Sequence, residues 1–190
     1  MNKSFSLTKA LTLLIIGLIA YNFYIFFTGT YASVLEGEIF SNETATPITI
    51  AYKDIFSQSK GFAGQLIEYF ELNEAIDTLL YEKLAIGALL LGCAFCVFGI
   101  VKVSKGEYNL LILGIILIFI SSGGLMLIVN KVEKLFKSTT DSYGFIGALI
   151  GDTITFSSDT SQHFIINILL IVPTAFLIYQ LANQSNKGEK

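Results

Sequence analysis

Two cysteines, Cys93 and Cys96, are the residues whose type and spacing most directly suggest chemistry, because they form a C-x-x-C. If their segment is helical, residues three apart lie on one face of the helix. Their Cα atoms then fall within the separation of about 4.4–6.8 Å that a disulfide requires. The spacing therefore permits a redox function in which the two thiols interconvert with a disulfide.

Three further residues carry polar groups at or inside apolar stretches. Asn22 and Asn167 lie inside such stretches, where amide side chains commonly hydrogen-bond between helices. Lining a polar path is the alternative, together with Pro173, which removes a backbone donor and should kink its helix. His163 is the only histidine and directly precedes an apolar stretch. We expect it to close the start of a helix, and no metal site is predicted around it.

These residues must be positioned by four apolar stretches, at about 10–27, 84–103, 110–129 and 164–182. Each has roughly the 17–25 residues that a helix needs to cross a bilayer. The composition agrees, since 14% of the residues are charged, against about 25% in soluble domains. The sequence predicts an all-α membrane protein with four transmembrane helices, as a single integral membrane domain over 1–190. The first stretch exceeds the apolar core of a signal peptide, so we expect an uncleaved anchor.

Four spans combined with Cys93 and Cys96 resemble, in outline, the bacterial quinone-linked disulfide oxidoreductases and the vitamin K epoxide reductase family. The resemblance implies a membrane thiol oxidoreductase that uses this pair. In those families the reactive pair lies near the outer membrane surface, and a second cysteine pair lies in an outer segment. Here the pair lies in the middle of its stretch, and the chain has two cysteines in total. Packing between helices is therefore the interpretation that we prefer for both cysteines.

Small residues gather on the second and third apolar stretches and predict helix-packing interfaces. Where side chains are small, the backbones of neighbouring helices can approach closely in a membrane. The predicted packing residues are Gly87, Gly92, Cys93, Cys96 and Gly99 in the second stretch, and Ser121, Ser122, Gly123 and Gly124 in the third.

Two outer segments, about 28–83 and 130–163, connect the spans on one side of the membrane. The part 31–50 is rich in Ser, Thr and Glu, and we expect extended or irregular chain there. From Phe62 onward, apolar residues recur at helical spacing with acids between them, which predicts an amphipathic helix. We expect this extramembrane helix to extend the second span without a break and to project beyond the membrane. Because its acids are spread around the helix, we expect a solvated face rather than a cation site.

The second outer segment contains an apolar, glycine-rich stretch over 143–151. Its length is too short to span and is compatible with an interfacial turn, a packed loop or a subunit contact. Together with the amphipathic helix, it supplies the residues that we predict to contact a partner. They are Phe62, Leu66, Phe70, Gly147 and Gly151.

The placement of lysines predicts the orientation. Half of the lysines lie in the two terminal tails and the short connection between the second and third stretches, so the positive-inside rule places both termini in the cytoplasm. Lys131, Lys134 and Lys137 argue against this orientation, but short connections weigh more. We expect a multi-pass protein of a bacterial inner membrane.

No motif for ATP, phosphate, haem, zinc or nucleophilic catalysis occurs in the sequence, so no cofactor is expected. A net charge of −3 without a basic run argues against nucleic acid. The leading hypothesis is a non-catalytic structural or accessory subunit of a larger membrane assembly, such as a secretion, envelope or motor complex, which contacts other subunits or itself. The alternatives are a small channel or transporter, lined by Asn167, Ser121, Ser122 and the Pro173 kink, and a thiol oxidoreductase.

Overall fold

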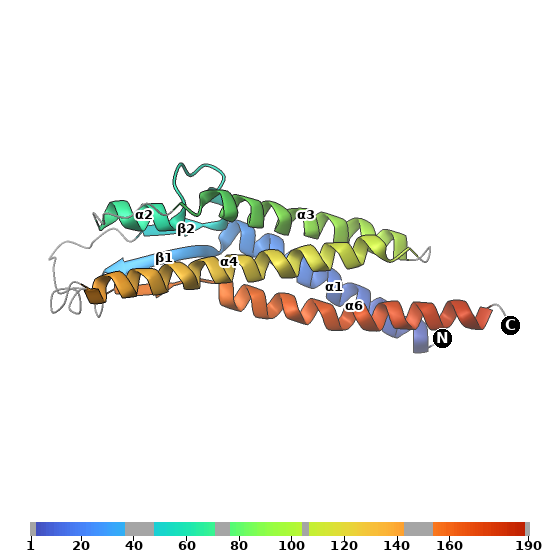
Figure 1. Ribbon diagram of the computed structural model, residues 1–190. Coiled ribbons are helices and arrows are strands. Elements are labelled where there is room, and N and C mark those ends of the chain that lie inside the picture. Colours follow the sequence, from blue (N-terminus) through green and yellow to red (C-terminus); the bar gives the residue numbers. More distant parts are fainter. Residues whose placement is uncertain (1–2, 37–47, 71–76, 104–106, 143–153, 189–190) are drawn as a thin grey trace.

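Four long helices dominate the computed structural model, which describes residues 3–36, 48–70, 77–103, 107–142 and 154–188 (Figure 1). They are α1 (Lys3–Thr28), α3 (Leu79–Val103), α4 (Asn109–Ser142) and α6 (Thr160–Gly188). Each contains a segment that is long and apolar enough to cross a membrane. The four predicted spans are therefore confirmed, and the chain has the architecture of a multi-pass membrane protein in contact with lipid.

The helices form a bundle in which α3 packs on α4, α4 on α6, and α6 on α1. The fourth contact, between α1 and α3, is the least extensive of these. Both termini lie at one end of the bundle (Figure 1). A small unit built largely from the segments that connect the spans, which we call the cap, lies at the other end. The cap consists of three strands, two short helices and the last part of α4.

The cap contains a three-stranded antiparallel sheet with the strand order β2-β1-β3. The strands are β1 (Thr30–Glu36), β2 (Ile48–Ala51) and β3 (Ile154–Ser157). The all-α prediction therefore needs a correction, and part of the segment expected to be extended or irregular is a regular sheet. The central strand is buried from Tyr31 to Val34, and it contains the β-branched Thr30 and Val34 and the aromatic Tyr31, which suit a pleated sheet.

The predicted continuous helix from the first outer segment into the second span is wrong. The structure has instead a short helix, α2 (Phe62–Tyr69), after which Phe70 leaves the helical conformation. The helix α3 begins separately at Leu79, whose backbone N–H donates to the Asp77 carboxylate at 2.9 Å. Such a side-chain cap satisfies a backbone donor at the beginning of a helix. Asp77 therefore marks a new helix start rather than one more turn of an extended helix.

The helix that continues past its predicted span is α4, and the second outer loop does not begin at 130. With 34 residues, α4 is about 51 Å long at 1.5 Å per residue, whereas the hydrocarbon core of a bilayer is about 30 Å thick. Its last turns stay helical because Val129, Val132 and Phe136 keep a helical spacing and are buried against the cap. Ring contacts of Phe136 with Phe70 and Phe156 hold them there.

One buried cluster joins the cap to the bundle. It contains Tyr31, Tyr52 and Phe62 from the cap and Ile25 and Ile86 from the spans. Tyr52 belongs to a single 3-10 turn, η1 (Tyr52–Asp54), that follows β2. A second cluster, deeper in the bundle, contains both cysteines. Because the first cluster has members on both sides of the boundary, the cap and the helices share one core.

Candidate functional site

A cluster of three buried polar side chains joins α1 to α6. The Asn22 Nδ2 group donates to Asn167 Oδ1 at 2.8 Å and to the Leu18 carbonyl oxygen at 2.9 Å. The His163 Nε2 atom lies 2.7 Å from Asn22 Oδ1. Asn22, His163 and Asn167 are 1%, 1% and 2% exposed. His163 and Asn167 are four residues apart on α6, so both point from the same face of that helix.

The hydrogen-bond pattern assigns the proton on the imidazole. An amide oxygen only accepts, so Nε2 of His163 must donate to Asn22 Oδ1. In the neutral ring, Nδ1 then carries a free lone pair. This Nδ1 atom and the Asn167 Nδ2 group are buried without a hydrogen-bond partner among the described residues. The cluster thus contains one buried acceptor, His163 Nδ1, and one buried donor group, Asn167 Nδ2, that are not hydrogen-bonded within the described residues.

Two aromatic rings pack against His163, one from η1 in the cap and one from α1. The ring of Tyr52 meets the imidazole edge-on with a centroid separation of 5.5 Å, and that of Tyr21 at 6.2 Å. The hydroxyl of Tyr52 is also buried without a partner in the described part of the chain. Burial, followed by the negative charge of Asp159, raises the pKa of Tyr52 above its usual range. Tyr52 therefore stays neutral and presents a hydroxyl, not a phenolate, to this region.

The register of the cluster is set by the junction between α1 and β1. The Thr30 backbone N–H donates to Asp159 Oδ2 at 2.7 Å, and the Asp159 N–H returns a bond to the Thr30 carbonyl at 3.1 Å. Gly29 allows the sharp turn out of α1, because a Cβ atom there would lie 2.7 Å from the Ile25 carbonyl oxygen. These bonds fix the beginning of α6 beside the end of α1, which places His163 opposite Asn22.

Sequence analysis singled out these three polar residues separately, and the structure brings them together. Pro173 lies buried further along α6, which stays helical on both sides of it. The neighbouring Thr174 hydroxyl donates to the Leu170 carbonyl at 2.9 Å. Mutual bonding of Asn22, His163 and Asn167 is the pattern of side chains that hold helices together. A polar path along these residues stays a prediction.

A second buried polar group, Glu82, was missed at the sequence level. Its carboxylate is 0% exposed and accepts bonds from the Phe62 N–H at 3.0 and 3.2 Å and from the Thr78 hydroxyl. Phe62 is the first residue of α2, where backbone N–H groups lack helical partners. Burial, and next the charge of Glu82, raises the pKa of Tyr31 beside it. Glu82 of α3 therefore accepts the hydrogen bonds at the beginning of α2 that no side chain at the N-cap residue Gly61 accepts.

The residues expected to contact a partner through the amphipathic helix face the protein's own core. Phe62 and Leu66 are buried, and the ring of Phe70 packs on that of Phe136 at 4.9 Å. The reason is that α2 packs against the rest of the cap and does not project from the second span. Gly147 and Gly151 lie outside the described residues.

The two cysteines are free, buried thiols of α3, and Cys96 lies in the contact between α3 and α4. Cys93 and Cys96 are buried, and the Cys96 thiol lies 3.9 Å from the Leu111 carbonyl oxygen. A Cβ atom at Gly92 would lie 2.8 Å from the Gly114 carbonyl, and one at Gly99 would lie 2.6 Å from the Leu111 nitrogen. The two backbones therefore approach closely. The sequence analysis missed Gly114, which forms the α4 side of this contact.

The other predicted packing residues are placed differently. The hydroxyls of Ser121 and Ser122 donate to carbonyl groups of their own helix, at 2.6 and 2.8 Å. A Cβ atom at Gly123 would lie 3.1 Å from the ring of Phe164 on α6, whereas Cβ atoms at Gly87 and Gly124 would meet open space. Close approach is thus concentrated where Gly92 and Gly99 meet α4.

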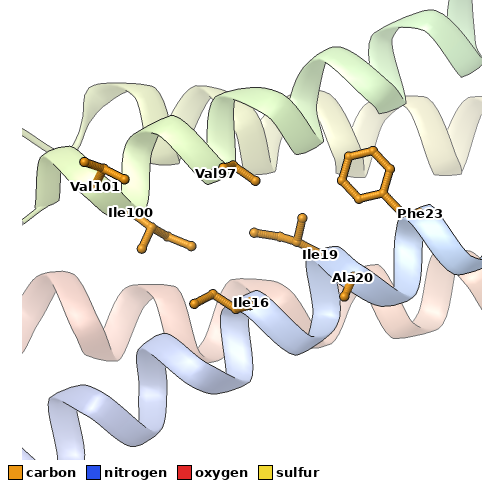
Figure 2. A pocket seen from close by; sticks show the side chains of 7 residues that line it. All are labelled: Ile16, Ile19, Ala20, Phe23, Val97, Ile100 and Val101. Atoms are coloured by element: carbon orange, nitrogen blue, oxygen red, sulfur yellow. The ribbon is translucent and has the colours of Figure 1, made fainter.

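An apolar groove of about 350 Å³ lies between α1 and α3. Figure 2 shows its lining, in which side chains from the two helices face each other across the gap. All of the lining residues are apolar, namely Ile16, Ile19, Ala20, Phe23, Val97, Ile100 and Val101. The groove follows from the helix order, because α1 and α3 touch least.

Within the described residues, no group of three or more His, Cys, Asp or Glu side chains is arranged to hold a metal ion. Comparison with models of protein families, with curated proteins and with solved structures finds no match to this chain.

Proposed function

We propose that the protein is a non-catalytic accessory subunit of a larger membrane assembly. The observation that carries this proposal is the groove between α1 and α3, which is wholly apolar and lies between two helices long and apolar enough to cross a membrane. Apolar side chains of another transmembrane helix can interlock with such a groove and gain van der Waals contacts that lipid chains fill less well.

The small-residue surface of α3 does not support a contact with a partner. Gly92, Cys96 and Gly99 pack against α4 of the same chain, so that surface is already occupied. The groove, in contrast, is left after all four helices have packed. It is therefore the face that we assign to another subunit or to a second copy.

The proposal is tested by measuring assembly while the groove is filled. Ala20 is exposed on the groove side of α1, so Ala20→Trp fills the groove without entering the protein's own core. Ile171→Trp is the matched control, because Ile171 is exposed on α6, away from the groove. Tagged variants would be extracted in mild detergent and weighed by native mass spectrometry.

We expect the unchanged protein and Ile171→Trp to be recovered in the same complex, and Ala20→Trp to lose most of it. A strictly monomeric protein in all three samples would overturn the proposed function. Equal assembly of Ala20→Trp and Ile171→Trp would show that the groove is not the contact.

A further inference from the structure

The loop that leads from η1 to α2 carries an exposed aromatic side chain where the cap meets the spans. Phe56 is 47% exposed, whereas Ile55 before it is fully buried in the core shared by the cap and the helices. The loop therefore turns one apolar side chain inward and the next one outward.

Hydrogen bonds hold this loop at the level where the chain leaves the membrane. Before it, the Tyr52 N–H donates to the Gly29 carbonyl at 3.4 Å, directly after the end of the α1 span. Within it, the Gln58 carbonyl accepts from Lys83 Nζ at 3.1 Å, near the beginning of the α3 span. Figure 1 shows the loop beside the first turns of α3. The end of α1 and the beginning of α3 therefore fix the position of the loop.

The candidate spans next to the loop expose apolar and aromatic side chains. Near the end of its span α1 exposes Tyr24 and Phe27, and near the beginning of its span α3 exposes Tyr81 and Leu84. Aromatic side chains at this depth form the belts by which membrane proteins sit at the interface between hydrocarbon and water. Phe56 continues this lipid-facing surface from the helices onto the cap.

The charged side chains before the loop are mixed, because the exposed Lys53 is followed by the exposed Asp54, and it is the lysine that suits lipid headgroups. Lys53 is exposed and makes no ion pair within the described chain, whereas Lys60, on the other side of Phe56, pairs with Glu68 at 2.8 Å. A lysine near the surface of a bilayer is attracted to the phosphates of anionic lipids. An exposed aromatic ring flanked by a lysine thus matches a lipid surface better than it matches open water.

We propose that the loop 55–61, together with Lys53 of η1, is a membrane-interface anchor, in which Phe56 inserts among the lipid headgroups at the cap end and Lys53 contacts their phosphates. The occupant is the bilayer itself, because the site is continuous with the lipid-facing surface of α1 and α3. The anchor fixes the depth of η1. Since the ring of Tyr52 in η1 packs on His163, the anchor also fixes the position of this ring over the polar cluster. This inference does not depend on the proposed assembly.

The absence of tryptophan from the chain allows a direct test. Phe56→Trp introduces one fluorophore, and the protein is reconstituted in vesicles of phosphatidylcholine and phosphatidylglycerol, with and without brominated acyl chains. Tyr81→Trp, at the lipid-facing start of α3, is the positive control. Tyr69→Trp is the matched negative control, because Tyr69 is 42% exposed on α2, next to the Phe70 ring that packs on the projecting part of α4.

We expect Phe56→Trp and Tyr81→Trp to emit at shorter wavelengths than Tyr69→Trp and to be quenched by the brominated lipids. Emission and quenching of Phe56→Trp equal to those of Tyr69→Trp would overturn the proposal. A blue-shifted emission that brominated lipids leave unquenched would also overturn it, because protein rather than lipid would then cover the loop.

Discussion

Replacing Asn22 with leucine should weaken the contact between α1 and α6 without leaving a cavity, because leucine has the branched shape of asparagine and a larger volume. Asn22 makes two bonds across this contact, to Asn167 at 2.8 Å and to His163 at 2.7 Å. Hydrogen bonds between transmembrane helices are worth roughly 0.6–2 kcal/mol each. Losing both should therefore lower the free energy of unfolding by about 1–4 kcal/mol.

The bond itself is isolated by a double-mutant cycle of Asn22→Leu and Asn167→Leu. Unfolding would be followed by circular dichroism in mixed micelles with increasing dodecyl sulfate. We expect a coupling energy of about 0.6–2 kcal/mol, because the second substitution removes a partner that the first has already orphaned. Asn22→Leu combined with Gly92→Ala is the control, since Gly92 lies in the separate contact between α3 and α4, and their effects should add. A coupling of Asn22 and Asn167 no larger than that of the control would refute the assigned cluster.

Two further predictions concern the α3–α4 contact and the junction of the cap. Gly92→Ala should destabilise by about 1–3 kcal/mol through overpacking, since its Cβ would lie 2.8 Å from the Gly114 carbonyl. Gly87→Ala, which meets open space, should stabilise by about 1 kcal/mol; equal effects on detergent unfolding would contradict the close approach. Glu82→Ala should speed hydrogen exchange over 62–69 by roughly five- to 150-fold, because a buried unpaired N–H at Phe62 costs about 1–3 kcal/mol, and Glu82→Gln, which keeps an acceptor, should have a smaller effect. Unchanged exchange in Glu82→Ala would show that the carboxylate does not hold α2.

The four spans could be predicted from the sequence because an apolar run long enough to cross a bilayer has few other uses. The sheet could not be predicted, since β2 and β3 have four residues each and β1 pairs with both across long separations in the chain. Such pairing leaves no local periodicity. The length of α4 was underestimated for a different reason, which is that its apolar pattern narrows after Val129 to the single face that packs on the cap.

The candidate site was predictable residue by residue but not as a cluster. Asn22 and Asn167 stand out because an amide inside an apolar run needs a partner, but nothing in the sequence names that partner. The spacing of four between His163 and Asn167 was the available signal, since it puts both on one face of α6. Glu82 was hidden by its position among charged neighbours at the edge of a span, where a solvated carboxylate is the ordinary expectation.

The two buried polar sites share one physical role, which explains why a membrane protein with a small cap retains them. In a membrane, helices gain little from the hydrophobic effect against one another, so apolar packing alone specifies depth and rotation weakly. The Asn22 cluster fixes α1 against α6 at one depth, and Glu82 fixes α2 against the first turn of α3. Tyr31 and Tyr52, whose rings meet edge-on at 5.8 Å, lie between these two sites in the shared core. A change in the register of either helix pair would leave polar groups unpaired where water cannot reach them. The polar residues therefore set the position of the cap relative to the groove between α1 and α3. The proposed function requires this groove to have one fixed geometry.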